Sequence, residues 1–130
     1  MAGSTNPMQS QLTNAKIKVN YTDGTTSILD LINPFNWWPI EQDYLDDNRA
    51  FDIPDDQIPY RVSLKSGELY KGGAWNRYTE IKGYSNRAID GGAATLLDLP
   101  LDSSKQLQSM ELIAVANDAV IGLISLTLLR

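Results

Sequence analysis

The chain of 130 residues contains neither cysteine nor histidine. Without cysteine it can form no disulfide bond and offers no thiolate nucleophile. Without histidine it lacks the general base of Ser-His-Asp and Cys-His catalysis, and the two absences together remove the usual zinc ligands. An enzyme built on this sequence would therefore depend on carboxylates, lysine, tyrosine or an oxygen-ligated metal.

Positive charge is also scarce, with 11 lysines and arginines against 16 aspartates and glutamates and a formal net charge of −5. The basic residues are scattered along the chain. Because phosphate recognition depends on a basic patch, this composition argues against a nucleic-acid partner. The longest apolar run, residues 119–129, is about half of the roughly 20 residues that a membrane helix needs, so we expect no membrane partner.

The first residues, 1–14, are small and polar, with no periodic pattern and none of the charged and apolar regions of a signal peptide. We expect this stretch to be a polar linker or a tail added for expression. Residues 15–130 are then expected to form a single domain, the last module of a longer protein.

Short stretches of alternating side chains favour β-strands. Residues 16–21 alternate between apolar and polar types, Asp23-Gly24 supplies a turn, and residues 25–31 return as the partner arm of a hairpin. Further strands are expected at 60–65, which also alternates, and at 93–101. Since no segment has the spacing of a long helix, the sequence predicts an all-β fold, a two-sheet antiparallel β-sandwich of the jelly-roll kind.

The end of the chain has two apolar stretches, residues 110–116 and 120–129, joined at Asn117-Asp118. Asn and Asp tolerate the backbone of a tight turn, so we expect a β-hairpin. The second arm is apolar on both sides, which a strand tolerates only when each face is covered. We therefore expect a central strand, one face in the core and the other under a neighbouring module, with Ile124→Ala or Leu126→Ala costing about 2–5 kcal/mol.

Trp37 and Trp38 lie in a loop with a proline on either side. In an extended chain neighbouring side chains point to opposite faces, so both cannot enter the same core. Either one fills the core while the other packs beneath a loop or against an adjoining domain, or one is a carbohydrate-binding platform. In the second case Asn36, Glu41 and Asp43 could supply hydrogen bonds to sugar hydroxyls.

A second candidate carbohydrate-binding cluster follows Gly72-Gly73. It combines aromatic, amide and guanidinium groups on a glycine-hinged loop, and such loops often carry function. Its members are Trp75, Asn76, Arg77 and Tyr78. The alternative is structural, with Trp75 anchoring the loop and Arg77 paired with an acid such as Glu80.

Residues 41–56 are rich in acidic side chains. Paired carboxylates would permit glycoside hydrolysis, and clustered oxygens would permit calcium binding. The spacing of an EF-hand is absent, and a charge run is usually a solvated face. We therefore assign no catalytic residue and no metal ligand, expect no cofactor, and keep calcium and a small carboxylate-dependent glycosidase as the less favoured alternatives.

Four stretches resemble the C-terminal module of a family of large gut-bacterial proteins of unknown function, associated with glycoside hydrolases in polysaccharide utilisation. They are NPFNWWPIEQDY (33–44), IPYRVSLKSG (58–67), GGAATLLDLPLDSSKQLQSMEL (91–112) and ANDAVIGLISLTLLR (116–130). No catalytic motif of the family falls within them.

The resemblance implies a jelly-roll β-sandwich appended to a helical-barrel, glycosidase-like domain, on proteins exported to the periplasm or cell surface. It implies a non-catalytic accessory module with a structural or docking role, whose partner is the adjoining catalytic domain. A carbohydrate-binding module that takes an oligo- or polysaccharide through exposed tryptophans is the alternative.

Overall fold

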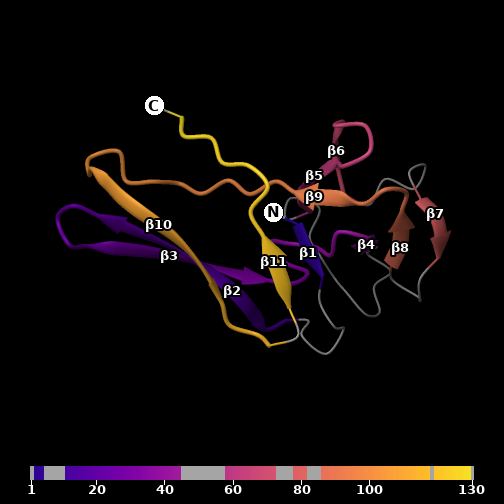
Figure 1. The fold of residues 1–130 in the computed structure, drawn as a ribbon, viewed down its shortest axis with the longest axis horizontal. Helices are drawn as coiled ribbons and strands as arrows, with labels where there is room; N and C mark the ends of the chain where they lie inside the picture. The colour runs from indigo at the N-terminus through magenta and orange to yellow at the C-terminus, as the bar shows by residue number, and fades with distance from the viewer. Residues whose placement is uncertain are drawn as a thin grey trace.

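The computed structural model describes residues 2–4, 11–44, 58–72, 78–81, 86–117 and 119–129. All regular elements in this part of the chain are β-strands, which confirms the all-β prediction. The strands form four antiparallel sheets of two or three strands each (Figure 1). The finer prediction, two sheets packed as a jelly-roll sandwich, stays a prediction.

The longest strands form one sheet in the order β10-β2-β3, with β2 at Thr13–Tyr21, β3 at Thr26–Ile32 and β10 at Leu107–Ala114. The predicted N-terminal hairpin is confirmed, because β2 and β3 pair antiparallel around Asp23-Gly24. Gly24 has a φ of 84°, a conformation that glycine adopts without strain. The apolar side of β2 is buried along its length, as the alternation predicts.

Two further sheets of three strands lie to the other side of the molecule (Figure 1). In one, β5 lies between β6 and β9; in the other, β8 lies between β4 and β7. The bounds are Gln42–Tyr44 (β4), Tyr60–Ser63 (β5), Leu69–Lys71 (β6), Tyr78–Ile81 (β7), Asn86–Ile89 (β8) and Ala93–Thr95 (β9). The strand expected at 93–101 is therefore shorter than predicted and ends five residues before Pro100.

The last sheet joins the two ends of the chain, since β1 at Ala2–Ser4 pairs antiparallel with β11 at Val120–Gly122. The stretch expected to be a linker, residues 1–14, thus contributes β1 and, from Thr13, the start of β2. Asn14 is completely buried.

The predicted C-terminal hairpin is wrong, because β10 pairs with β2 and β11 pairs with β1. The reason lies at the end of β10, where the backbone N–H groups of Val115 and Ala116 both donate to the carbonyl of Asn14 at 2.9 Å. These bonds hold the chain against the start of β2. The following turn then directs β11 toward β1 instead of back along β10.

The expectation of a central, doubly covered strand at 120–129 is also wrong. Regular pairing ends at Gly122, and residues 123–129, here called the C-terminal segment, continue without strand, turn or bend. Ile124 is 56% exposed and Leu126 is 61% exposed. The apolar pattern correctly indicates a segment that needs cover, but the described residues of the chain do not supply it.

Among the described residues, two clusters of buried side chains contribute to the core. Ala15, Ile17, Leu31 and Trp37 form the first, and Tyr70, Ile89 and Ala93 form the second. Trp37 places the loop at 33–41 in the first cluster. The loop is bonded to β9 at two points, since the N–H of Ala93 donates to the carbonyl of Ile40 at 2.7 Å and the N–H of Trp38 donates to Thr95 Oγ1 at 3.2 Å.

Candidate functional site

Both tryptophans of the pair are buried, and they point into different surroundings. Trp37 joins the cluster of Ala15, Ile17 and Leu31. The indole N–H of Trp38 donates to the carbonyl of Pro34, and the guanidinium carbon of Arg61 lies 5.7 Å from the centroid of its ring. The different surroundings agree with the argument that both rings cannot enter the same core, but the enclosure of both rings corrects the hypothesis that this pair presents an exposed sugar platform.

Asn36 is engaged within its own loop. Its side-chain oxygen accepts a hydrogen bond from the N–H of Ile32 at 2.8 Å, and its side-chain nitrogen donates to the carbonyl of Asp30 at 2.7 Å. This amide closes the turn after β3 and is not free for a sugar hydroxyl. Asp43 lies on β4 opposite Arg87, and its side chain lies outside the described part of the chain.

Arg61 is a buried charged side chain on β5, the strand that the alternation at 60–65 predicts. It is completely buried, while its neighbour Tyr60 is 53% exposed. The guanidinium donates to the carbonyls of Pro39 and Ala93, each at 2.7 Å. Because hydrogen bonding offsets the cost of burying the charge, this arginine acts as an internal cross-link.

The cluster Trp75, Asn76 and Arg77 lies outside the described residues, as does the side chain of Tyr78 at the start of β7. Carbohydrate binding there stays a prediction. Most of the acidic segment, residues 45–56, is also outside the description. In the part of the chain that is described, no group of three or more acidic side chains could hold a metal ion.

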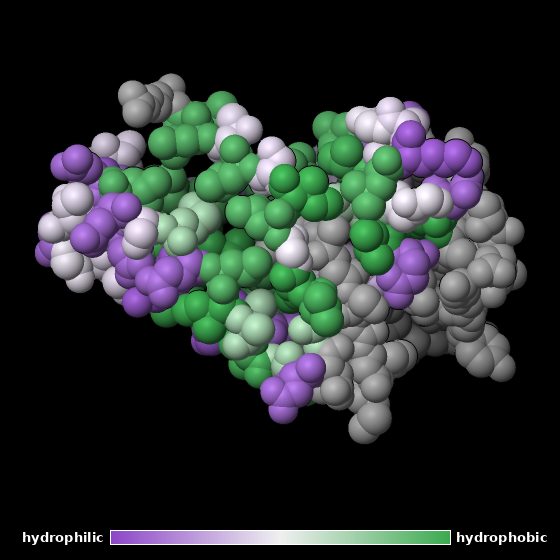
Figure 2. All heavy atoms as spheres, in the orientation of Figure 1, coloured by the Kyte–Doolittle hydropathy of each residue, from purple (hydrophilic) through white to green (hydrophobic). Residues whose placement is uncertain are grey.

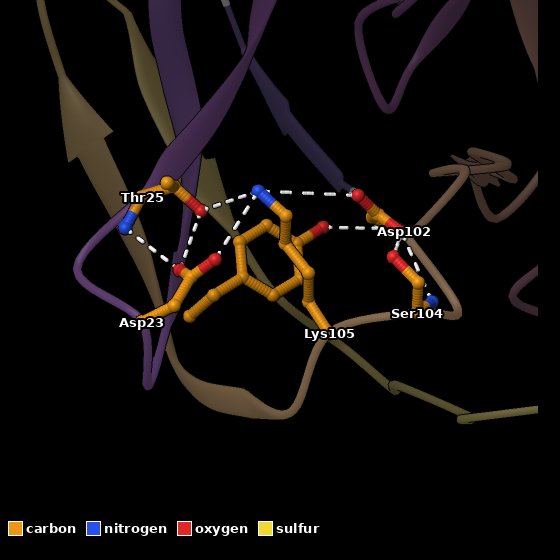
Figure 3. Close-up of polar contacts among 6 residues, drawn as sticks. Asp23, Thr25, Asp102, Ser104 and Lys105 are labelled. Atoms are coloured by element: carbon orange, nitrogen blue, oxygen red, sulfur yellow. Dashed lines mark hydrogen bonds and ion pairs between the residues drawn. The ribbon is translucent and has the colours of Figure 1, made fainter.

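Lys105 lies between two turns and contacts both (Figure 3). Its ammonium nitrogen is 2.8 Å from Thr25 Oγ1, 3.3 Å from Asp23 Oδ2 and 4.0 Å from Asp102 Oδ2. It also lies 5.5 Å from the centroid of the Tyr21 ring. These contacts tie the turn between β2 and β3 to the turn that precedes β10.

The two aspartates of this polar cluster are held ionised by their own turns. The hydroxyl and the backbone N–H of Thr25 donate to Asp23 at 2.6 and 2.9 Å and lower the pKa of its carboxyl, with Lys105 adding to the effect. Ser104 donates to Asp102 in the same way, at 2.6 and 3.0 Å, and lowers its pKa. A carboxylate with a lowered pKa is a poor general acid, so the geometry favours a structural role.

An apolar groove of about 110 Å³ lies between the long sheet and the C-terminal segment. Ile17 of β2 and Met110 and Leu112 of β10 form one side, and Leu123 and Leu126 form the other. All of these side chains are aliphatic. Figure 2 shows the wider setting: hydrophobic side chains gather over the middle of this face, and along the C-terminal segment they are interspersed with weakly polar ones.

The exposed apolar surface is concentrated at the end of the chain. Six large side chains there are at least half exposed: Val120, Leu123, Ile124, Leu126, Leu128 and Leu129. Contiguous apolar surface of this kind marks interaction sites far more often than isolated exposed leucines do. The sequence signal for this surface is the apolar character of both faces of 120–129, which indicates a need for cover.

Comparison of the chain with protein-family models, with curated proteins and with solved structures found no match in any of the three. The described residues include no helix long and apolar enough to cross a membrane.

Proposed function

We propose that this chain is a non-catalytic accessory β-domain of a carbohydrate-active protein, and that it docks onto another protein through the apolar groove and the C-terminal segment. One observation supports the proposal above all others. A run of seven residues, 123–129, places five large aliphatic side chains in solvent beside a groove that is itself aliphatic. Burying such a surface against a partner is favourable by roughly 25 cal/mol for each Å² removed from water.

The chemistry of the groove favours a protein partner over a sugar. A carbohydrate site needs polar groups that converge on an exposed aromatic ring or apolar platform. The groove side chains, by contrast, carry no hydrogen-bonding group other than the weakly accepting sulfur of Met110. An apolar partner side chain would fill this space without leaving a polar group unsatisfied.

A non-catalytic role agrees with the state of the described carboxylates. Asp23 and Asp102 accept hydrogen bonds from their own turns, and Asp30 pairs with Lys16 at 3.0 Å. These groups are committed to local structure rather than aimed at a shared cleft. The association with glycoside hydrolases, and with an adjoining catalytic domain as partner, is supported by the family resemblance of residues 33–44, 58–67, 91–112 and 116–130.

The proposal is tested by measuring whether the native domain presents this surface. ANS fluorescence should rise on adding the wild-type monomer at low concentration, while near-UV circular dichroism shows native packing. Leu123→Ser/Leu126→Ser should lose most of that rise. Leu69→Ser/Leu96→Ser is the matched control, because these leucines are similarly exposed but lie away from the groove. This control variant should keep the rise in ANS fluorescence.

Three results would contradict the proposal. The first is a monomer that binds no ANS, because the surface would then be covered in solution. The second is retardation by a polysaccharide in affinity electrophoresis that survives in Leu123→Ser/Leu126→Ser, and the third is release of reducing ends. Either of the last two would assign the domain a carbohydrate site.

A further inference from the structure

We propose that the partner at this surface is a second copy of the chain, and that the two C-terminal segments pair antiparallel about a two-fold axis at Leu126. This inference rests on the proposed docking function and names the occupant of the same surface. It is argued from the backbone, the side-chain order, the charge and the side-chain exposure of the segment.

The backbone of the C-terminal segment is available for pairing. It continues directly from β11, whose three residues pair with β1. Within the described part of the chain, no backbone hydrogen bond joins residues 123–129 to another segment. An apolar segment whose N–H and C=O groups are not held in a sheet can be added as a strand to another chain.

The side chains of the segment are ordered as a chemical palindrome. Reading outward from Leu126, each position matches its mirror position: two hydroxyl residues, then two branched aliphatics, then two leucines (Ser125 and Thr127, Ile124 and Leu128, Leu123 and Leu129). A two-fold interface requires a surface that complements itself. Antiparallel pairing centred on Leu126 meets this requirement at every position, because like chemistry meets like across the axis.

The charge of the segment also favours a second copy. The chain carries a net charge of −5, so two copies repel one another over most of their surfaces. Residues 119–129 contain no charged side chain, and the segment has none of the lysines or prolines that commonly block edge pairing. Self-association through these residues therefore brings no like charges into direct contact.

The exposed side chains of the segment give such a dimer apolar surface to bury. Five of its seven residues are large aliphatics, and each of these is at least half exposed. Removing apolar surface of this kind from water stabilises association.

The first test is the mass of the protein in solution. Sedimentation equilibrium of the wild-type chain should show a concentration-dependent species of twice the 14.4 kDa chain mass. Leu126→Lys places two ammonium groups opposite one another on the axis and should raise the dimer dissociation constant at least tenfold. Ile28→Lys is the matched control, since Ile28 is 57% exposed against 61% for Leu126 but lies on β3, and it should dimerise like wild type.

The second test reads the register directly, because a chain without cysteine allows single thiols to be placed at will. Leu126→Cys should form a disulfide-linked dimer on mild oxidation, since position 126 faces itself across the axis. Leu129→Cys should not, because the two copies of position 129 lie about 20 Å apart at roughly 3.4 Å per residue. A mixture of Leu123→Cys and Leu129→Cys should cross-link to each other.

A wild-type chain that stays monomeric at hundreds of micromolar overturns the inference. If that monomer binds ANS, the proposed docking function stands with a different protein as partner; if it does not, both proposals fail. A dimer that persists in Leu126→Lys, or equal cross-linking of Leu126→Cys and Leu129→Cys alone, overturns the pairing about Leu126.

Discussion

Gly72 lies directly against the indole of Trp38, and a Cβ atom placed at Gly72 would come within 2.7 Å of Trp38 Cζ3. The backbone N–H of Gly72 also donates to the carbonyl of Pro59 at 2.9 Å. The residue after β6 is therefore held over one face of the ring, and the guanidinium of Arg61 lies over the ring as well. This packing makes Trp38 a structural residue and makes glycine a requirement at position 72.

Gly72→Ala should destabilise the domain by about 1–3 kcal/mol, the usual cost of overpacking a well-filled site. Urea unfolding followed by circular dichroism measures the loss. The double-mutant cycle with Trp38→Leu supplies the control, because a smaller side chain at 38 leaves room for the added methyl group. If Gly72→Ala costs the same in both backgrounds, the contact with Trp38 is not the cause.

Arg61→Met should lower the free energy of unfolding by more than about 2 kcal/mol, although methionine is apolar and of similar length. The substitution leaves the buried carbonyls of Pro39 and Ala93 without their donor, and an unsatisfied buried acceptor costs about 1–3 kcal/mol. Lys65→Met is the comparison. It removes an exposed ion pair with Asp90, so its effect should stay within about 1 kcal/mol.

The sequence predicts local structure well where two strands that pair lie next to each other in the chain. The alternation at 16–21 and the Asp23-Gly24 turn lie next to residues 25–31, so the hairpin could be read directly. At 60–65 the same pattern correctly predicts a strand, β5, but it gives no sign that Arg61 is completely buried. Carbonyls from residues 39 and 93 meet the Arg61 side chain in the interior, and such distant acceptors leave no local signal.

The candidate site was predictable in part. The apolar faces of 120–129 indicate a surface that needs cover, and that surface is the candidate site. Its position was not predictable, because pairing of β11 with Ala2–Ser4 and of β10 with β2 depends on contacts between the two ends of the chain. The adjacent tryptophans similarly predict two directions but not that both directions lead to the interior.

Ile124→Ala and Leu126→Ala should each change the free energy of unfolding of the monomer by less than about 0.5 kcal/mol, as is usual for exposed positions. Leu31→Ala is the reference, because Leu31 is completely buried in the first core cluster and should cost about 2–5 kcal/mol. The free energies of unfolding are compared at a protein concentration at which no dimer forms. Losses above about 2 kcal/mol at 124 and 126 would restore the central strand that the sequence predicts.

The cluster around Lys105 should make the domain less stable in acid. The carboxyl groups of Asp23 and Asp102 have pKa values lowered from 3.8 in the folded chain, mainly by the hydroxyl hydrogen bonds of Thr25 and Ser104. A group whose pKa is lower when folded contributes stability above its unfolded pKa, and that contribution is lost as pH falls through the folded value. The melting temperature should therefore decrease as the pH is lowered below about 4. The double variant Asp23→Asn/Asp102→Asn should show a smaller decrease. If the melting temperature of the double variant decreases in acid as much as that of wild type, groups other than these two carboxyls cause the loss of stability.

Tryptophan emission can separate the two buried rings from the third tryptophan, Trp75. In Trp75→Phe the remaining emission comes from Trp37 and Trp38, which are enclosed, so it should be blue-shifted and weakly quenched by acrylamide. Oligosaccharides should leave this emission unchanged, because neither ring can offer a face to a pyranose. Wild type is the comparison, and a sugar-dependent shift seen there but lost in Trp75→Phe would assign carbohydrate binding to the predicted cluster at residues 75–78. A shift that persists in Trp75→Phe would mean that the packing of Arg61 and Gly72 over Trp38 opens to admit a ligand, which the enclosure of both rings argues against.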